Sequence, residues 1–199
     1  MSDRPLHVLA VVGSLNQNSV TRVVLRHITE ALRQQSCSVD LLDLRDEPLT
    51  LFDPELFERS PTFVALQSRV VQADVYVLGT PDYHGSISGV MKNFLDHFWT
   101  EFSGKLFVPI VASHEKGLTV VDQMRTVARQ CYAWALPYAL SFVEGDEVSG
   151  GQVVSEKLQR RLDMTLRDLR VYGQMLARQR AADLAGTDAG FMARHRKKT

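Results

Sequence analysis

The sequence lacks the features that define several large classes of protein. Only two of its 199 residues are cysteines, Cys37 and Cys131, and neither belongs to a Cys-x-x-Cys pair or to a Cys/His cluster with metal-ligand spacing. A disulfide framework, a zinc site of known spacing and an iron–sulfur cluster are therefore not expected. No apolar run approaches the roughly 18 residues that span a bilayer, and Val8–Val12 is too short for the core of a signal peptide. We expect no bound metal, no membrane partner and a location in the cytoplasm.

The sequence also lacks a net charge, because its 23 basic and 23 acidic side chains cancel. This balance gives no reason to expect nucleic acid as a partner. The charge is unevenly distributed, since the last six residues carry four basic side chains and no acid, which leaves residues 1–193 with a net charge of −4. We expect a single domain over residues 1–185, followed by a flexible basic tail over residues 186–199.

The sequence does contain short apolar runs that alternate with segments of helical periodicity. Strands are predicted at residues 6–12, 39–44, 75–79, 106–112 and 138–143. Helices are predicted from Val20, from Ser60–Pro61 to about Gln72, and over residues 87–100, 119–135 and about 155–180. Successive β–α units with right-handed crossovers predict an α/β three-layer sandwich with a five-stranded parallel sheet in the order 2-1-3-4-5. Its ligand crevice is expected at the carboxyl ends of strands 1 and 3.

Three loops at that edge carry groups suited to ligand binding. Residues 13–21 place hydroxyls and amides around a helix N-terminus, which suits a phosphate monoester or simply caps the helix. With one Gly and no Lys, this loop is neither a Walker loop nor a dinucleotide fingerprint. The loop after the third strand offers Tyr83 and His84 as flat surfaces, although its composition alone is more typical of a Pro/Gly turn before a core helix. The third loop is Ser113–Gly117.

These motifs, in this order, resemble those of the NADPH-dependent FMN reductase family. The first is Gly-Ser-x-x-x-x-Ser after the first strand, and the second is Pro-x-Tyr-Asn-Gly-Ser-x-x-Gly-x-Leu-Lys-Asn-x-x-Asp. The second motif is matched at Pro81, Tyr83, Gly85, Ser86, Gly89, Lys92, Asn93 and Asp96. The resemblance implies a flavodoxin-like fold, FMN as cofactor, NADPH or NADH as electron donor, and a homodimer or homotetramer. Trp99, which is hard to bury in the same monomer as its neighbours, also favours a subunit interface.

The resemblance further implies a role for each matching loop. The FMN phosphate would be held by Ser14, Asn16, Ser19, Val20 and Thr21. The isoalloxazine ring would be lined by Pro81, Asp82, Tyr83, His84, Gly85 and Ser86, and its other edge would be reached by Ser113, His114 and Gly117. No protein residue is expected to be catalytic, because the chemistry takes place on the flavin.

The chain departs from the family pattern at three places. His84 replaces the usual Asn, Asn16 stands where many members have Arg, and residues 113–117 replace a Gly-rich loop. The leading hypothesis is an oxidoreductase that passes electrons from NAD(P)H through FMN to a flavin, quinone, azo or similar small-molecule acceptor by a ping-pong mechanism. The alternatives are a flavodoxin-like electron carrier, which the mildly acidic body disfavours, and a flavin-binding regulatory protein without significant turnover.

Overall fold

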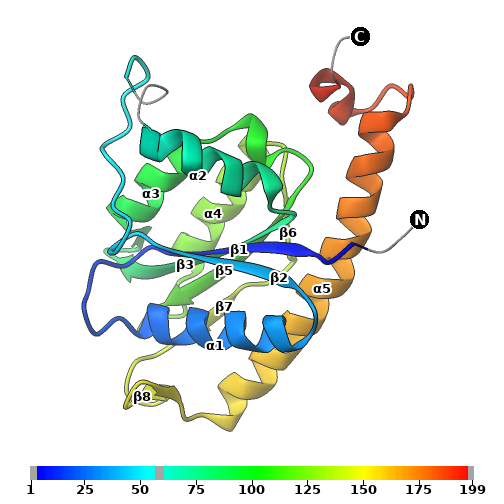
Figure 1. Cartoon of the computed structure of the whole chain (residues 1–199). Coiled ribbons are helices and arrows are strands. Elements are labelled where there is room, and N and C mark those ends of the chain that lie inside the picture. The colour runs from blue at the N-terminus through cyan, green and yellow to red at the C-terminus, as the bar shows by residue number, and fades with distance from the viewer. Residues whose placement is uncertain (1–3, 57–60, 197–199) are drawn as a thin grey trace.

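A twisted sheet forms the middle layer of this protein, in a computed structural model that describes residues 4–56 and 61–196 (Figure 1). Neighbouring strands follow the order β2-β1-β3-β5-β6, with β4 attached to β3 and β7 attached to β5. All pairs are parallel except β3 with β4. The strands are β1 (His7–Val12), β2 (Ser38–Asp43), β3 (Val75–Tyr83), β4 (Ser86–Ile87), β5 (Leu106–Ala112), β6 (Trp134–Ala135) and β7 (Leu140–Phe142). The hairpin of β8 (Val148–Ser149) and β9 (Gln152–Val153) is separate from this sheet.

The predicted order of the long parallel strands is confirmed, whereas the predicted number of five strands is wrong because the sheet has seven. One of the extra strands arises because the sheet edge beside β5 is divided into two short strands at the level of Pro109. The strand predicted at residues 138–143 is confirmed as the shorter β7, which pairs with Ile110–Ala112. The helix predicted over residues 119–135 ends earlier, because residues 134–135 form β6, which pairs with Leu106 and Phe107. The gap between these pairings falls at Pro109, which has no N–H to donate to a neighbouring strand.

The other extra strand comes from the segment after Gly79. β3 continues to Tyr83 and folds back through a two-residue turn into β4, so that Tyr83 pairs with Ser86. Part of the predicted loop is therefore a short β-hairpin, which projects from the carboxyl end of the sheet.

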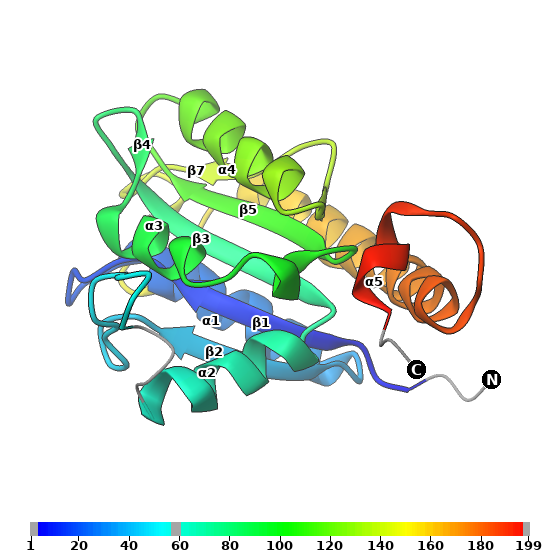
Figure 2. The ribbon, with the colours of Figure 1, turned by 90° about the horizontal axis from the view of Figure 1, so that it is seen from above.

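Helices cover both faces of the sheet (Figure 2). On one side lie α1 (Val20–Gln34) and α5 (Glu156–Ala185), and on the other lie α2 (Pro61–Gln72), α3 (Gly89–Asp96) and α4 (Leu118–Gln130). Successive side chains of β1 point to opposite faces of the sheet. Val8 and Ala10 pack towards α1 and α5, while Leu9 and Val11 pack towards the other helices. Burial on both faces explains why the buried stretches of the central strands are almost entirely apolar.

Helix α3 is shorter than the 87–100 predicted. Ile87 belongs to the hairpin, and the Ser88 side chain caps the helix by accepting a hydrogen bond from the N–H of Met91. After Asp96 the chain turns into a 3-10 helix, η2 (Thr100–Phe102). The α2 start predicted at Ser60–Pro61 agrees with the observed start at Pro61, whereas Ser60 lies outside the described residues.

The segment after α5 packs against the domain, whereas the sequence predicts a flexible tail there. Residues 191–195 form a second 3-10 helix, η3 (Phe191–His195), whose Met192 is only 1% exposed. Phe191 stacks on Tyr132 with 6.3 Å between ring centroids, and the Arg194 guanidinium lies 4.2 Å from the centroid of the same tyrosine. These apolar and cation–π contacts anchor the described part of the basic segment. Among the described residues, no helix is long and apolar enough to cross a bilayer.

Candidate functional site

The loop between β1 and α1 presents unpaired backbone donors at the start of a helix. Ser19 caps α1, because its hydroxyl oxygen accepts the N–H of Arg22 at 3.3 Å. Among the described residues, no protein acceptor takes the N–H groups of Ser19, Val20 and Thr21. Ser14 and Ser19 are both buried. The positive end of the helix dipole and these free donors make the loop suitable for an anion.

The turn between β3 and β4 presents an aromatic side chain beside this loop. Tyr83 is 51% exposed at the end of β3. His84 and Gly85 form the turn with φ angles of 57° and 74°, the pattern of a type I′ hairpin turn. Positive φ at both positions favours Asn-Gly, which explains the Asn of the family motif, and His84 occupies that position here.

Asp82 joins the second and third predicted loops. One of its carboxylate oxygens accepts the N–H of Gly85 at 2.8 Å, and the other accepts the hydroxyl of Ser113 at 2.8 Å. The Ser113 oxygen in turn accepts the N–H of Glu115 at 3.1 Å. The carboxylate therefore fixes the position of both loops relative to each other.

Sequence reasoning did not identify Ser88, which connects the first and second loops. Its hydroxyl donates to the Gly13 carbonyl at 2.6 Å, and its N–H donates to the Thr80 hydroxyl at 3.0 Å. The sequence signal was present, since a serine directly before an apolar helical period is typical of a cap.

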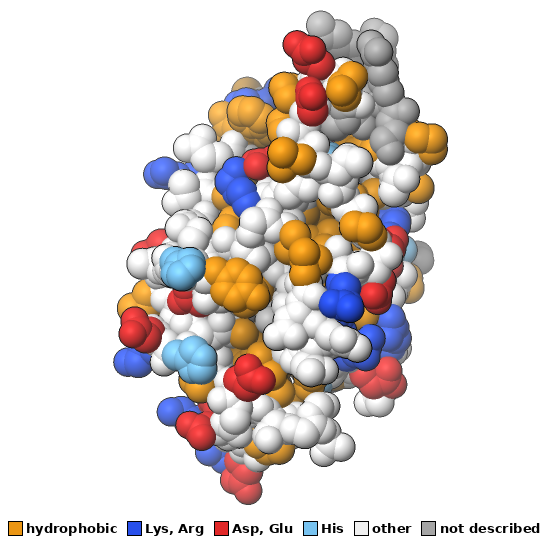
Figure 3. All heavy atoms as spheres, turned by 90° about the vertical axis from the view of Figure 1, so that its left-hand side faces the viewer, with side chains coloured by type: hydrophobic (Ala, Val, Ile, Leu, Met, Phe, Trp, Pro, Cys, Tyr) orange, Lys and Arg blue, Asp and Glu red, His pale blue; other side chains and the backbone are white. Residues whose placement is uncertain are grey.

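A cavity of 140 Å³ lies where the three loops meet. Ten of the predicted residues line it: Ser14, Asn16, Ser19, Val20, Thr21, Pro81, Asp82, Tyr83, Ser113 and His114. Ala112 and Glu144, which the sequence did not suggest, complete its wall. The surface at this end of the sheet carries interspersed acidic and basic side chains (Figure 3).

The other four predicted residues lie outside this wall. His84 and Gly85 form the adjoining turn, and the Ser86 hydroxyl donates to Gln123 of α4 at 3.0 Å. Gly117 is the N-cap residue of α4 with φ of 60°, and a Cβ there would stand 2.6 Å from a methyl group of Val111. Gly117 is therefore required by backbone conformation and close packing.

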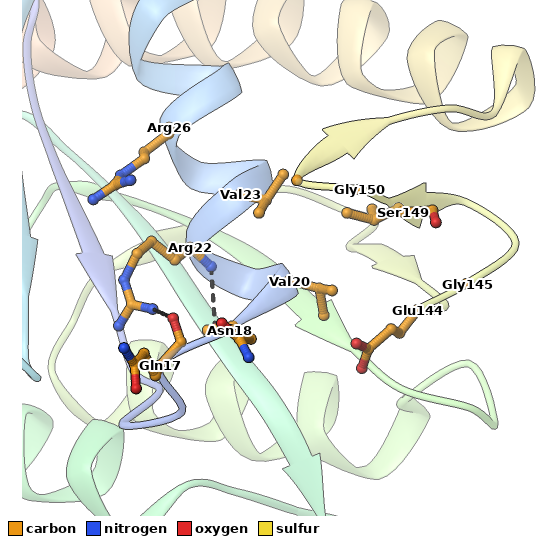
Figure 4. Close-up of a pocket in the computed structure, with 13 residues that line it drawn as sticks. Gln17, Asn18, Val20, Arg22, Val23, Arg26, Glu144, Gly145, Ser149 and Gly150 are labelled. Atoms are coloured by element: carbon orange, nitrogen blue, oxygen red, sulfur yellow. Dashed lines mark hydrogen bonds between the residues drawn. The ribbon is translucent and has the colours of Figure 1, made fainter.

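A second cavity of 490 Å³ lies between α1 and the β8–β9 hairpin (Figure 4). It shares Ser19, Val20 and Glu144 with the first cavity, so the two spaces meet at the N-terminus of α1. Arg22 and Arg26 line the second cavity, whereas no Lys or Arg in the described part of the chain lines the first. An anion in the first cavity would therefore depend on backbone N–H groups and hydroxyls.

This fold and site define a flavodoxin-like class of α/β protein, with a loop suited to an anion where the strand order reverses between β1 and β3. The chain belongs to the NADPH-dependent FMN reductase family, whose model matches residues 6–147. The family predicted from the motifs is confirmed, and with it the enzyme class that the family defines, NAD(P)H-dependent oxidoreductases that use FMN.

Individual relatives agree with this family. An FMN-dependent NADPH-azoreductase of Staphylococcus aureus is 28% identical over 145 residues, which are 69% of this chain and 77% of that protein. The apo form of an NADH:FMN oxidoreductase superposes with a TM-score of 0.67 at 18% identity, over 84% of this chain and 89% of that one. A flavoenzyme NAD(P)H:acceptor oxidoreductase of Paracoccus denitrificans gives a TM-score of 0.68 at 19% identity, over 83% and 98%. At these identities the two structures support the fold alone.

Proposed function

We propose that this protein is an FMN-dependent oxidoreductase that passes electrons from NADPH or NADH to a small-molecule acceptor by a ping-pong mechanism. The observation that carries the proposal is the meeting of three loops around one cavity, beside free N–H groups at the start of α1. When bound, FMN would supply a ring that accepts hydride from a nicotinamide and delivers electrons to a second substrate. The protein's own task is then to bind, orient and expose that group.

The first loop fits the phosphate end of FMN. The N–H groups of Ser19, Val20 and Thr21 are free to donate, and a phosphate monoester offers several strong acceptors. The buried hydroxyls of Ser14 and Ser19 stand beside them. Since the cavity wall contains no cation, the helix dipole would supply the favourable field.

The second and third loops fit the ring system. Tyr83 offers an exposed aromatic face, and Asp82 holds Ser113 and the turn at Gly85 in fixed positions. The cavity, at 140 Å³, is smaller than the roughly 300 Å³ at which typical ligand pockets begin. The ring would therefore stay partly exposed, and its open face would serve the nicotinamide and then the acceptor, as a ping-pong cycle requires.

An open site of this kind accepts flat electron acceptors without close selection. We propose flavins, quinones and azo compounds as substrate classes, in keeping with the azoreductase of Staphylococcus aureus. The competing electron-carrier function is disfavoured by the interspersed charges of this face, because docking to redox partners favours a field of one sign.

Anaerobic titration of the FMN-loaded protein with NADPH or NADH tests the enzyme proposal. We expect the nicotinamide to bleach the flavin absorbance, and a quinone or azo dye added afterwards to restore it. A yellow protein that no nicotinamide reduces would instead favour the regulatory function. Turnover with a protein electron acceptor alone would favour the carrier.

A pair of matched serine variants tests the phosphate assignment. Ser19 and Ser155 cap α1 and α5 in the same way, with cap hydrogen bonds of 3.3 and 3.2 Å. Each Ser→Ala change should lower stability by about 1 kcal/mol, but Ser19→Ala alone should weaken FMN binding, measured by quenching of flavin fluorescence. Equal FMN affinities in the two variants would contradict the assignment. Tyr83→Ala should also weaken binding, with the exposed Tyr172→Ala as its control.

We also propose assembly as a homodimer or homotetramer and a location in the cytoplasm. Trp99 is 64% exposed, a large apolar surface for an isolated chain, and analytical ultracentrifugation at micromolar concentration should detect the oligomer. The cytoplasmic proposal is supported by the two cysteines, which are both unpaired, as expected in a reducing compartment.

A further inference from the structure

We propose that Arg22 is a positioning residue for the ligand phosphate, because it turns the carbonyl groups of the β1–α1 loop inward and so presents the loop's N–H groups to the anion. This inference rests on the proposed FMN function. It concerns a side chain that touches no ligand atom and acts through the backbone of residues 14–17.

The guanidinium of Arg22 donates hydrogen bonds to backbone carbonyl groups of the β1–α1 loop. One terminal nitrogen donates to the carbonyls of Asn16 and Gln17 at 2.8 and 3.1 Å, and the other donates to the carbonyl of Ser14 at 3.4 Å. Figure 4 shows the side chain of Arg22 folded back from α1 towards Gln17. Arg45 donates to the remaining carbonyl, that of Leu15, at 2.6 Å. Two arginines thus hold four consecutive carbonyl groups.

Asp43, at the end of β2, holds Arg22 in place. Its carboxylate accepts hydrogen bonds from the Nε of Arg22 and, at 3.3 Å, from Nη2, and it also accepts the N–H of Arg45 at 3.1 Å. Both side chains of the Arg22–Asp43 ion pair are buried. Asp43 raises the pKa of Arg22, so the guanidinium remains charged throughout the physiological range. A buried ion pair of this kind contributes little net stability, because desolvation offsets the attraction between the charges. Its main effect here is to fix the position of the Arg22 guanidinium.

The consequence for the ligand follows from peptide geometry. A peptide carbonyl and the N–H of the next residue point in opposite directions, so fixing the carbonyls of residues 14–17 also fixes the N–H groups of residues 15–18. The N–H groups of Asn16 and Asn18 are taken by the side-chain oxygens of Ser14 and Asn16, whereas those of Leu15 and Gln17 have no acceptor among the described residues. These two donors add to the free N–H groups at the start of α1. Carbonyl oxygens turned into the cavity would instead repel a phosphate.

Riboflavin and FMN provide the test, since they share the ring and the ribityl chain and differ only in the phosphate. We expect the wild-type protein to bind FMN more tightly than riboflavin. Arg22→Lys keeps the charge, but its single ammonium group cannot reach the carboxylate and three carbonyls at once. The Kd for FMN should therefore rise about ten-fold or more, while the Kd for riboflavin changes less than about two-fold. Arg69→Lys is the matched control, because the Arg69 guanidinium is also held by ion pairs, with Asp40 and Glu47, but touches no part of the loop.

Each outcome decides between the proposals. A protein that binds neither flavin overturns the proposed function and this inference with it. A wild-type preference for FMN that Arg22→Lys leaves unchanged, or an equal loss for both flavins, overturns the inference alone. If circular dichroism shows that Arg22→Lys does not fold, Arg45→Ala serves as the second test. Arg45 is at the surface, and its replacement removes its side-chain hydrogen bond to the Leu15 carbonyl, so the Kd for FMN should rise about three-fold. An unchanged Kd ratio in that variant also overturns the inference.

Discussion

Lys105 allows a prediction of how stability depends on pH. It directly precedes β5 at the end of the sheet away from the candidate site, and it is only 3% exposed. Its ammonium group donates to the carbonyls of Val70 and Val71 at 3.0 and 2.8 Å and to the hydroxyl of Tyr76 at 3.1 Å. Burial lowers the pKa of Lys105 from 10.5 to about 7. The folded protein therefore releases this proton more readily than the unfolded chain does.

The direction of the effect follows from this difference. The cost of burying the charged amine is fully present below pH 7, decreases as pH rises, and is absent above pH 10.5. Stability from this group should therefore increase with pH across that window. The difference between the two pKa values, 10.5 and about 7, corresponds to about 1.4 kcal/mol for each pKa unit. The total change in the free energy of unfolding is therefore about 5 kcal/mol. Burial also raises the pKa of Tyr76 well above 10, which acts in the opposite direction at high pH and confines the measurement to lower values.

Lys105→Met removes the titrating group and keeps an unbranched side chain. Urea unfolding followed by tryptophan fluorescence, between about pH 7 and pH 9, should show that the stability of wild type relative to this variant rises by about 1.4 kcal/mol for each pH unit. Lys92→Met is the control, because Lys92 is an exposed lysine paired with Asp96, and its difference from wild type should stay flat. Parallel pH profiles for wild type and Lys105→Met would refute the reasoning.

Three further predictions concern stability. His84→Gly should stabilise the protein by about 1 kcal/mol in urea unfolding, because His84 holds a φ of 57° that glycine adopts without strain; a loss would show that its side chain makes a needed contact. Ser88→Ala should cost about 1–2 kcal/mol by calorimetry, because it removes the α3 cap and the hydrogen bond to Gly13, and an unchanged melting temperature would contradict this. Met192→Ala should release the segment after Ala185, seen as faster limited proteolysis there with cleavage elsewhere unchanged; equal rates would mean that Met192 does not anchor it.

Much of the architecture could be predicted because its causes are local. A strand segment buried on both faces is expected to be apolar, and β1, β5 and the first part of β3, residues 75–79, show this directly in their sequences. Handedness then restricts the strand order, and the order places the loops after these strands at one edge. The meeting of ten predicted residues around one cavity follows from that placement.

The remaining features depend on pairings that a sequence does not display. Arg22 of α1 forms a buried ion pair with Asp43 of β2, and nothing near Arg22 in the sequence indicates that partner. Ser86 fits the family motif, but the β3–β4 hairpin directs its hydroxyl towards Gln123 of α4. In the C-terminal segment, the basic residues suggested a solvated tail, whereas Met192 provides the buried contact.

The break opposite Pro109 also bears on how the protein avoids aggregation. The outer edge of a sheet is a template for strands of other chains when it presents a long row of unpaired backbone groups. Here that edge consists of β6 with two residues and β7 with three, separated by a segment that contains Pro137. Neither piece is long enough to guide the addition of a further strand, and the proline between them offers no N–H. The interruption therefore disfavours edge-to-edge pairing at this edge of the sheet while leaving the buried strands intact.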